Sequence, residues 1–134
     1  MIVVDASALI AILDEEDDAA RYAEALAEAD SPLVSAATLV ETGIVMLNRH
    51  GPKGVQKMTA LLQEGACQVE SVTEQHAQLA LYAYATYGKG QKGKAGLNYG
   101  DCFSYALAKA TGLPLLFKGN DFPRTDIEPA LSVE

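Results

Sequence analysis

The sequence predicts an α/β fold with a central short parallel sheet flanked by helices on both faces. Short apolar runs alternate along the chain with longer segments of helical composition, the order expected when helices connect parallel strands. The chain has 134 residues, 49% of them hydrophobic, which suits a single domain, residues 1–134, with a core of its own. No internal repeat or linker divides the sequence.

The first part of the chain predicts two strands separated by two helices. Ile2–Val4 is an aliphatic run too short for a helix and typical of a buried strand. Ala6–Leu13 has helix-forming composition, and the acidic residues that open Asp17–Ala29 favour the start of a second helix. Ser31-Pro32 indicates a turn before the next strand, Leu33–Ser35.

The middle of the chain predicts two helices and a third strand. Apolar residues recur at helical spacing from 36 to about 48, and Gly51-Pro52 ends that helix. Another helix is expected from Val55 to about Glu64. Cys67–Val72 then alternates between polar and apolar residues, as a strand does.

The last part predicts two helices, a loop and a final strand. Thr73 begins a helix that Gly88 closes, and a loop rich in lysine and glycine follows from Lys89 to Gly96. Asn98 to about Thr111 has a helical pattern, and Leu115–Phe117 is the last apolar run.

Four acidic residues stand in positions that solubility does not require. Asp5 directly follows the first strand, and Asp121 lies just past the last one. Glu41 interrupts the apolar pattern of its helix, and Asp101 opens the helix that begins near 98. Most of the other acidic residues fall on polar faces, where we expect them to be solvated.

Each of these residues also has a structural interpretation. Asp5 could cap the following helix, Asp101 suits the positive end of a helix dipole, and Asp121 is a common turn residue. Glu41 is harder to explain, because a carboxylate among apolar neighbours shifts its pKa, finds a partner or binds a metal.

Considered together, the four carboxylates predict a cation site. In parallel α/β folds, sites form outside the carboxyl ends of the strands, where Asp5 and Asp121 lie, and Glu41 and Asp101 are on helices that could flank that crevice. Like charges held together need a cation, and a set of oxygen ligands suits Mg²⁺ or Mn²⁺. Such ions activate water and stabilise phosphoryl displacement. Ser7 offers a hydroxyl for a metal-bound water or a phosphate oxygen.

The chain resembles the VapC-like members of the PIN-domain superfamily at these acidic residues, and the resemblance extends over nearly the whole chain. The resemblance is carried by four stretches, of which the third is the most specific: Ile2–Leu9, Val34–Glu41, Gly96–Cys102 and Gly119–Phe122. It implies a PIN-like domain that acts as a metal-dependent endoribonuclease on single-stranded RNA and serves as the toxin of a type II toxin–antitoxin system. Such proteins are usually homodimers, inhibited by a VapB-like antitoxin whose tail enters the acidic pocket.

The resemblance also assigns roles to the acidic residues. Asp5 and Asp101 would be the main Mg²⁺ ligands, and Glu41 and Asp121 would complete the pocket, directly or through metal-bound water. Two positions depart from the family pattern. Ala6 stands where relatives often carry threonine or serine, with the Ser7 hydroxyl close by, and the pair Asn120-Asp121 stands where relatives often have two acids.

The loop after Gly88 carries Lys89, Lys92 and Lys94, the densest positive patch of the chain. Its glycines superficially fit phosphate-binding motifs, but those require a preceding strand, and here a helix precedes. The loop is predicted either to bring RNA to the acidic crevice or to be a solvated linker.

Charge and composition narrow the remaining choices. The net charge of −8 repels nucleic acid at long range, which disfavours a simple nucleic-acid-binding module but suits a nuclease whose carboxylates hold cations. The sequence enters a strand at once and has no apolar run long enough for a bilayer, so we expect a cytoplasmic protein without membrane contact. Cys67 and Cys102 are expected to be free thiols.

Two other functions fit part of the pattern. A receiver-like phosphotransfer domain needs a lysine after a late strand, where Lys118 stands, but also an aspartate at a central strand end, which Cys67–Val72 lacks. A non-catalytic protein-binding module could keep the acidic pocket only to hold a partner, and a cleavage assay separates it from a nuclease.

Overall fold

The computed structural model describes residues 1–91 and 95–132 and has a parallel sheet at its centre. The strands lie in the order β3-β2-β1-β4 and are short: β1 (Val3–Val4), β2 (Leu33–Ser35), β3 (Gln68–Glu70) and β4 (Leu115–Leu116). Val3 pairs with both Leu33 and Leu115, so β1 is central and its carboxyl end opens between two neighbours.

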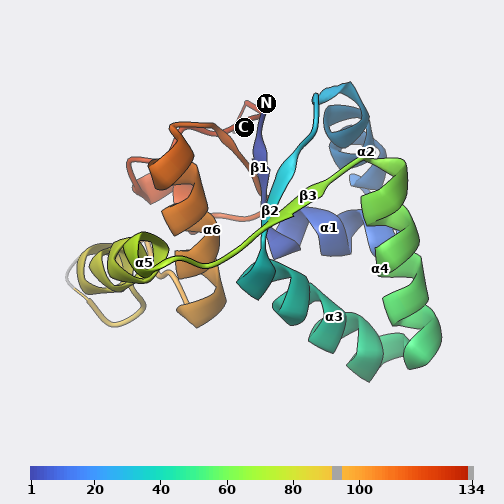
Figure 1. The fold of residues 1–134 in the computed structure, drawn as a ribbon, viewed down its shortest axis with the longest axis horizontal. Coiled ribbons are helices and arrows are strands. Elements are labelled where there is room, and N and C mark those ends of the chain that lie inside the picture. The colour runs from blue at the N-terminus through green and yellow to red at the C-terminus, as the bar shows by residue number, and fades with distance from the viewer. Residues whose placement is uncertain (92–94, 133–134) are drawn as a thin grey trace.

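Helices cover both faces of the sheet, as the sequence predicts (Figure 1). Their bounds are α1 (Ala6–Leu13), α2 (Ala19–Glu28), α3 (Ala36–His50), α4 (Pro52–Glu64), α5 (Glu74–Tyr87) and α6 (Tyr99–Thr111), with a 3-10 turn at Phe122–Arg124. Helices α5 and α6 pack on one face, and α1, α2 and α4 pack on the other.

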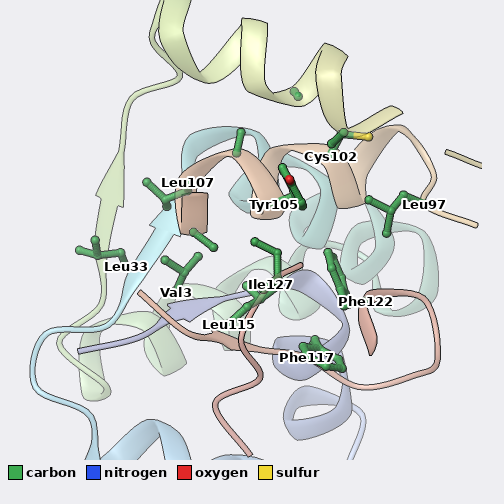
Figure 2. Close-up of a cluster of buried hydrophobic side chains, with 14 residues drawn as sticks. Val3, Leu33, Leu97, Cys102, Tyr105, Leu107, Leu115, Phe117, Phe122 and Ile127 are labelled. Atoms are coloured by element: carbon green, nitrogen blue, oxygen red, sulfur yellow. The ribbon is translucent and has the colours of Figure 1, made fainter. Parts of the chain in front are cut away.

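Alternation along the strands divides the core into two clusters. Val3 points to the face covered by α5 and α6, where it joins the side chains of Figure 2, and Val4 points to the opposite face. Both residues are fully buried. Burial of such aliphatic side chains stabilises a fold by roughly 1.5–3 kcal/mol each. The short strands are therefore held mainly by packing from two sides.

The element bounds differ from the sequence prediction in a few places. Helix α4 begins at Pro52, because proline lacks an N–H and suits the first helical turn, so Gly51-Pro52 both ends α3 and starts α4. Helix α2 begins at Ala19, two residues later than expected. Strand β3 is confined to Gln68–Glu70, because it lies at the sheet edge and pairs only with β2.

The segment after β4 folds back along the sheet, a feature that the sequence does not predict. The N–H of Leu115 donates to the Glu128 carbonyl at 2.9 Å, and the N–H of Ala130 donates to the Leu115 carbonyl at 2.8 Å. The Tyr105 hydroxyl donates to Asp126 at 2.8 Å and ties α6 to the same segment. This segment therefore covers the outer side of β4.

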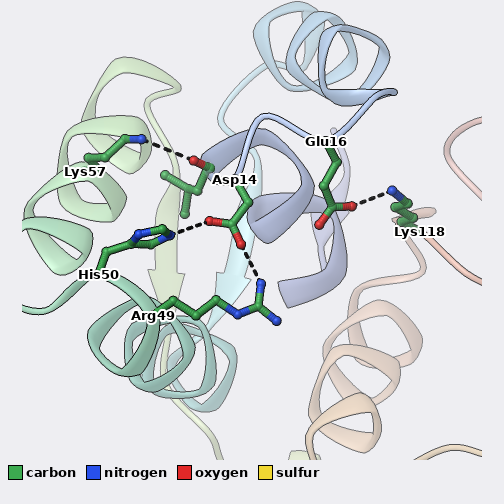
Figure 3. Close-up of polar contacts among 7 residues, drawn as sticks. Asp14, Glu16, Arg49, His50, Lys57 and Lys118 are labelled. Atoms are coloured by element: carbon green, nitrogen blue, oxygen red, sulfur yellow. Dashed lines mark hydrogen bonds and ion pairs between the residues drawn. The ribbon is translucent and has the colours of Figure 1, made fainter.

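Ion pairs join the helices around the sheet (Figure 3). Asp14, just after α1, accepts hydrogen bonds from Arg49 and His50 at the end of α3, and these bonds hold the pKa of Asp14 below its usual value despite partial burial. Lys118, after β4, donates to Glu16 and Asp18. Within the described ranges, no helix is both long and apolar enough to cross a membrane.

Candidate active site

Asp5 lies at the carboxyl end of β1 and is 2% exposed. It caps α1, because its Oδ2 accepts the Ser7 N–H at 3.0 Å, and the Ser7 hydroxyl donates to the same oxygen at 2.6 Å. Its Oδ1 accepts the hydroxyl of Ser104 at 2.6 Å. The capping interpretation is therefore correct, and the same bonds fix the carboxylate rigidly at the end of the central strand.

Glu41 lies on α3 and is half-buried. Its Oε1 is a buried polar atom without a hydrogen-bond partner among the described residues. Burial, followed by the negative charge of Asp5, raises the pKa of Glu41 to about 7. A buried carboxylate oxygen without a donor is unfavourable, so this atom is suited to accept a group from outside the protein.

Asp101 lies in the first turn of α6 and forms a capping box with Asn98. The Asn98 N–H donates to its Oδ2 at 3.0 Å, and the Asp101 N–H donates to the Asn98 side chain at 2.9 Å. Burial raises the pKa of Asp101 to about 7, with further contributions from the charges of Asp5, Asp121 and Glu41, while the Asn98 bond opposes them. Asp101 thus stabilises the helix and faces the other acids.

Asp121 is exposed and precedes the 3-10 turn at Phe122–Arg124, which it does not cap through its side chain. Its Oδ1 lies beside Gly96, where an added Cβ would be 3.6 Å away. The residue therefore closes one side of the site without a structural role of its own in that turn.

The four acidic residues line one cleft of about 240 Å³ at the carboxyl ends of β1 and β4. Its walls come from β1, α1, α3, α6 and the segment after β4: Asp5, Ala6, Ser7, Ile10, Glu41, Asn98, Asp101, Lys118, Asp121 and Phe122. Sequence positions almost 120 residues apart thus meet at one place. The structure thus brings the four acidic residues together in one cleft.

Of the other predicted site residues that the structure describes, Ser7 lines the cleft, and Asn120 and Lys89 do not. The Ser7 hydroxyl already donates to Asp5 and accepts the Lys118 N–H at 2.9 Å, so it supports the carboxylate rather than standing free. Asn120 lines a neighbouring hollow between α2 and the segment after β4. Lys89 is exposed at the start of the loop, whereas Lys92 and Lys94 lie outside the described residues.

The donor set of the cleft fits a hard divalent cation. Its candidate ligands are carboxylate oxygens, and Glu41 supplies one without a partner. In the described part of the chain, no three His, Cys, Asp or Glu side chains are close enough to surround one ion by themselves. Mg²⁺ does not need such a group, because proteins usually hold it through one or two carboxylates and several waters.

Comparison with known proteins identifies the family of this chain. The model of the PIN domain family matches residues 2–128. The chain is 51% identical to ribonuclease VapC28 of Mycobacterium tuberculosis, covering 96% of this chain and 97% of that protein. The chain belongs to the PIN-domain family and to its VapC ribonucleases. It is also 46% identical to ribonuclease VapC of Mycolicibacterium smegmatis, over 93% of this chain and 96% of the relative.

The fold of this VapC-family chain is shared with a solved structure. VapC20 of Mycobacterium tuberculosis, described as a toxin that cleaves the sarcin–ricin loop, superposes with a TM-score of 0.77 over 95% of this chain and 96% of that one. The sequences are 19% identical, so this similarity concerns the fold alone. The family assignment favours the nuclease over the receiver-like alternative, and the amine of Lys118 is paired with Glu16 and Asp18.

The sequence alone did not assign a role to two residues that shape the cleft, Ser104 and Gly100. Ser104 bonds Asp5, and the backbone of Gly100 lies against the Glu41 carboxylate. Two signals were available. Ser104 is a polar residue in an apolar helical run, three positions after Asp101, and Gly100 is a glycine inside a helix, where it has a packing or functional reason.

The Gly100 contact gives a testable prediction. A Cβ at Gly100 would overlap the Glu41 carboxyl group, which must then move. We expect Gly100→Ala to lower RNA cleavage about 100-fold, as displacement of an aligned group by an ångström can. The fold should survive or gain stability, because alanine favours a helix by up to about 1 kcal/mol over glycine. Cleavage assays and thermal melts measure the two effects.

Gly43→Ala is the matched control for this prediction. It changes a helical glycine of α3, but its Cβ would meet only Met58, at 3.5 Å, an ordinary contact. This control should cut RNA normally. Equal activity of both variants would show that the position of Glu41 does not matter.

Proposed function

We propose that this chain, as a single nuclease domain over residues 1–134, is a Mg²⁺-dependent endoribonuclease that cleaves single-stranded RNA and acts as the toxin of a toxin–antitoxin pair. Mn²⁺ should substitute for Mg²⁺. The observation that carries the proposal is the unpartnered, buried Oε1 of Glu41 in a cleft shared with Asp5 and Asp101. The names of its VapC relatives support RNA as the substrate.

The acidic residues of the cleft would have different roles in the reaction. Asp5 and Asp101 would hold the cation, with Glu41 and Asp121 completing its surroundings. When bound, a divalent ion polarises the phosphate and promotes deprotonation of water. Glu41, whose pKa lies at about 7, is suited to accept the proton of the attacking water. Water would form the new P–O bond as the bond to the leaving ribose oxygen breaks.

Metal removal tests the proposal directly. Purified protein should cleave single-stranded RNA in Mg²⁺, lose this activity in excess EDTA, and recover it when Mg²⁺ or Mn²⁺ is restored. The physical reason is that the carboxylates alone repel a phosphate backbone and offer no charge to stabilise the reacting phosphate. Cleavage that persists at full rate in EDTA would refute the metal mechanism. Intact RNA under every condition would favour the non-catalytic binding module.

The lysine loop is proposed to guide RNA to the cleft. In a chain of net charge −8, an acidic site needs neighbouring cations to admit phosphates. Replacing Lys89, Lys92 and Lys94 by alanine should weaken RNA binding and reduce the salt slope of the affinity by about 2, at ~0.7 per lost contact. Replacing Lys53, Lys57 and Lys109 makes the same charge change elsewhere, and should alter the slope less. Equal slopes would identify the loop as a linker.

We further propose a homodimer that works in the cytoplasm and is inhibited by a VapB-like antitoxin. Large apolar side chains are exposed on α3 and α5, among them Val40, Ile44 and Leu81, which is 72% exposed. An apolar groove of about 360 Å³ lies between α5 and α6. Copies of a strongly acidic chain repel one another, so a face poor in charge is the favoured contact. The acidic cleft suits a basic segment of an antitoxin.

A further inference from the structure

A chain of buried hydroxyl groups runs behind the acidic cleft. The Ser104 hydroxyl donates to Oδ1 of Asp5 at 2.6 Å, and the Thr38 Oγ1 lies 3.2 Å from the Ser104 Oγ. Ser104 and Thr38 are both 0% exposed. The Ser104 hydroxyl has one hydrogen, and it donates this hydrogen to the Asp5 carboxylate, the nearer acceptor. In the contact with Thr38, Ser104 must therefore be the acceptor and Thr38 the donor.

The hydroxyl chain joins α3, α6 and the end of β1, which position Glu41, Asp101 and Asp5. Thr38 lies on α3 three residues before Glu41, and Ser104 lies on α6 three residues after Asp101. A separation of three residues places two side chains on one side of a helix, a turn apart. Each hydroxyl therefore lies one turn from an acid on its own helix and bonds across to another element.

The cost of these groups indicates that they serve the site. A hydroxyl removed from water loses free energy unless it is bonded, and alanine would fill the Ser104 position without that requirement. Ser104 lies in the buried stretch Cys102–Ala108, whose other members are apolar or aromatic. The hydroxyl of Ser104 bonds Asp5, which lines the cleft, and Thr38, which lies on the helix that carries Glu41.

We propose that Ser104, supported by Thr38, is a positioning residue for Asp5. Ser7 donates twice to Oδ2 and Ser104 donates once to Oδ1, so the carboxylate is held at both oxygens and Oδ1 keeps a second lone pair for a ligand in the cleft. The Thr38–Ser104 bond joins α3 to α6 and so helps to set the separation at which Glu41 and Asp101 share one cleft. The inference rests on the proposed metal-dependent function, because it assigns these hydroxyls to the alignment of a metal ligand.

The test compares Ser104→Ala and Thr38→Val with a matched control, Thr42→Val. Thr42 is also 0% exposed and on α3, but its hydroxyl donates to the Thr38 carbonyl of its own helix at 2.8 Å. Calorimetry with Mn²⁺ alone measures metal affinity, cleavage kinetics measure kcat and KM, and thermal melts report folding. Ser104→Ala should bind Mn²⁺ about 10–100-fold more weakly, the usual loss when a ligand's supporting partner is removed.

The other variants sharpen the result. Thr38→Val should weaken Mn²⁺ binding less than Ser104→Ala, and Thr42→Val should leave it unchanged. The double variant of Ser104 and Thr38 should bind no more weakly than Ser104→Ala, since Thr38 acts through Ser104. Additive losses, or equal affinities for Ser104→Ala and Thr42→Val, would overturn the inference. If Ser104→Ala fails to fold, the comparison of Thr38→Val with Thr42→Val decides.

Wild-type measurements separate this inference from the proposed function. A wild-type protein that neither binds Mn²⁺ nor cleaves RNA would refute the function itself. A wild-type protein that binds and cleaves, beside hydroxyl variants that do so equally well, would refute only the positioning role.

Discussion

Asp101→Asn should lower the rate of RNA cleavage by roughly 10³-fold or more. A loss of this size is expected when one of several residues that act together in catalysis is removed. Asparagine keeps the shape of aspartate but lacks the negative charge that a hard cation requires. Its amide oxygen can still accept the Asn98 N–H that now bonds Asp101 at 3.0 Å. The helix cap is therefore retained, and the loss of activity would reflect charge rather than unfolding.

The same substitution should stabilise the protein when metal is removed. Burial and the neighbouring charges raise the pKa of Asp101 to about 7, so its ionised form is unfavourable in the folded chain. Each tenfold change in proton affinity corresponds to about 1.4 kcal/mol. Because Asp101 is partly exposed to solvent, which weakens the effect, we expect the substitution to raise the free energy of unfolding at pH 8 by about 1–3 kcal/mol. In a chain of this size the gain raises Tm by several degrees.

Thermal melts in EDTA at pH 8 and cleavage assays in Mg²⁺ measure the two effects of Asp101→Asn. Asp17→Asn removes one charge from an exposed residue near α2 and is the matched control, expected to cut normally. An Asp101→Asn protein that melts at a lower temperature yet cuts RNA normally would restrict Asp101 to its role in the helix dipole, worth ~0.3–1 kcal/mol.

The fold could be predicted from the sequence because its local signals agree. Val3 and Val4 form a run too short for a helix, and both side chains are buried on opposite faces of the sheet. The segment after β4 gave no comparable signal, because its pairing with Leu115 uses backbone groups and an isolated bridge at Pro129. Such tertiary pairing has no periodicity that a sequence could reveal.

The sequence predicts that the four acidic residues lie close together, but it does not predict the residues that support them. Asp5 and Asp101 each serve as helix caps and also line the cleft, so the structural and the site interpretations were never exclusive. Ser104 could not be assigned from the chain alone, because its partner Asp5 is 99 positions away. The bond exists only because α6 packs across the end of β1.

Stability of the metal-free protein should fall as the pH rises from about 4 to about 7. Glu41 and Asp101 have ordinary pKa values of 4.5 and 3.8, and both are raised to about 7 in the folded chain. Between about pH 4 and pH 7 the folded state binds more protons than the unfolded state, so the free energy of unfolding falls as the pH rises. Below about pH 4 the trend reverses, because Asp14 and Asp126 have lowered pKa values and lose their partners on protonation.

Urea unfolding in EDTA at pH 5 and pH 8 measures this dependence. The wild type should be less stable at pH 8, by an amount on the order of a few kcal/mol, since both carboxyl groups must release a proton that the folded chain holds more tightly. A double variant, Glu41→Gln with Asp101→Asn, cannot ionise at these positions and should lose much less stability over the same range. Added Mg²⁺ should stabilise the wild type more at pH 8 than at pH 5, because protons compete with the cation for the carboxylates. A wild-type stability that is flat or rises from pH 5 to pH 8 would mean that these acids do not crowd one another, and the case for a cation between them would fail.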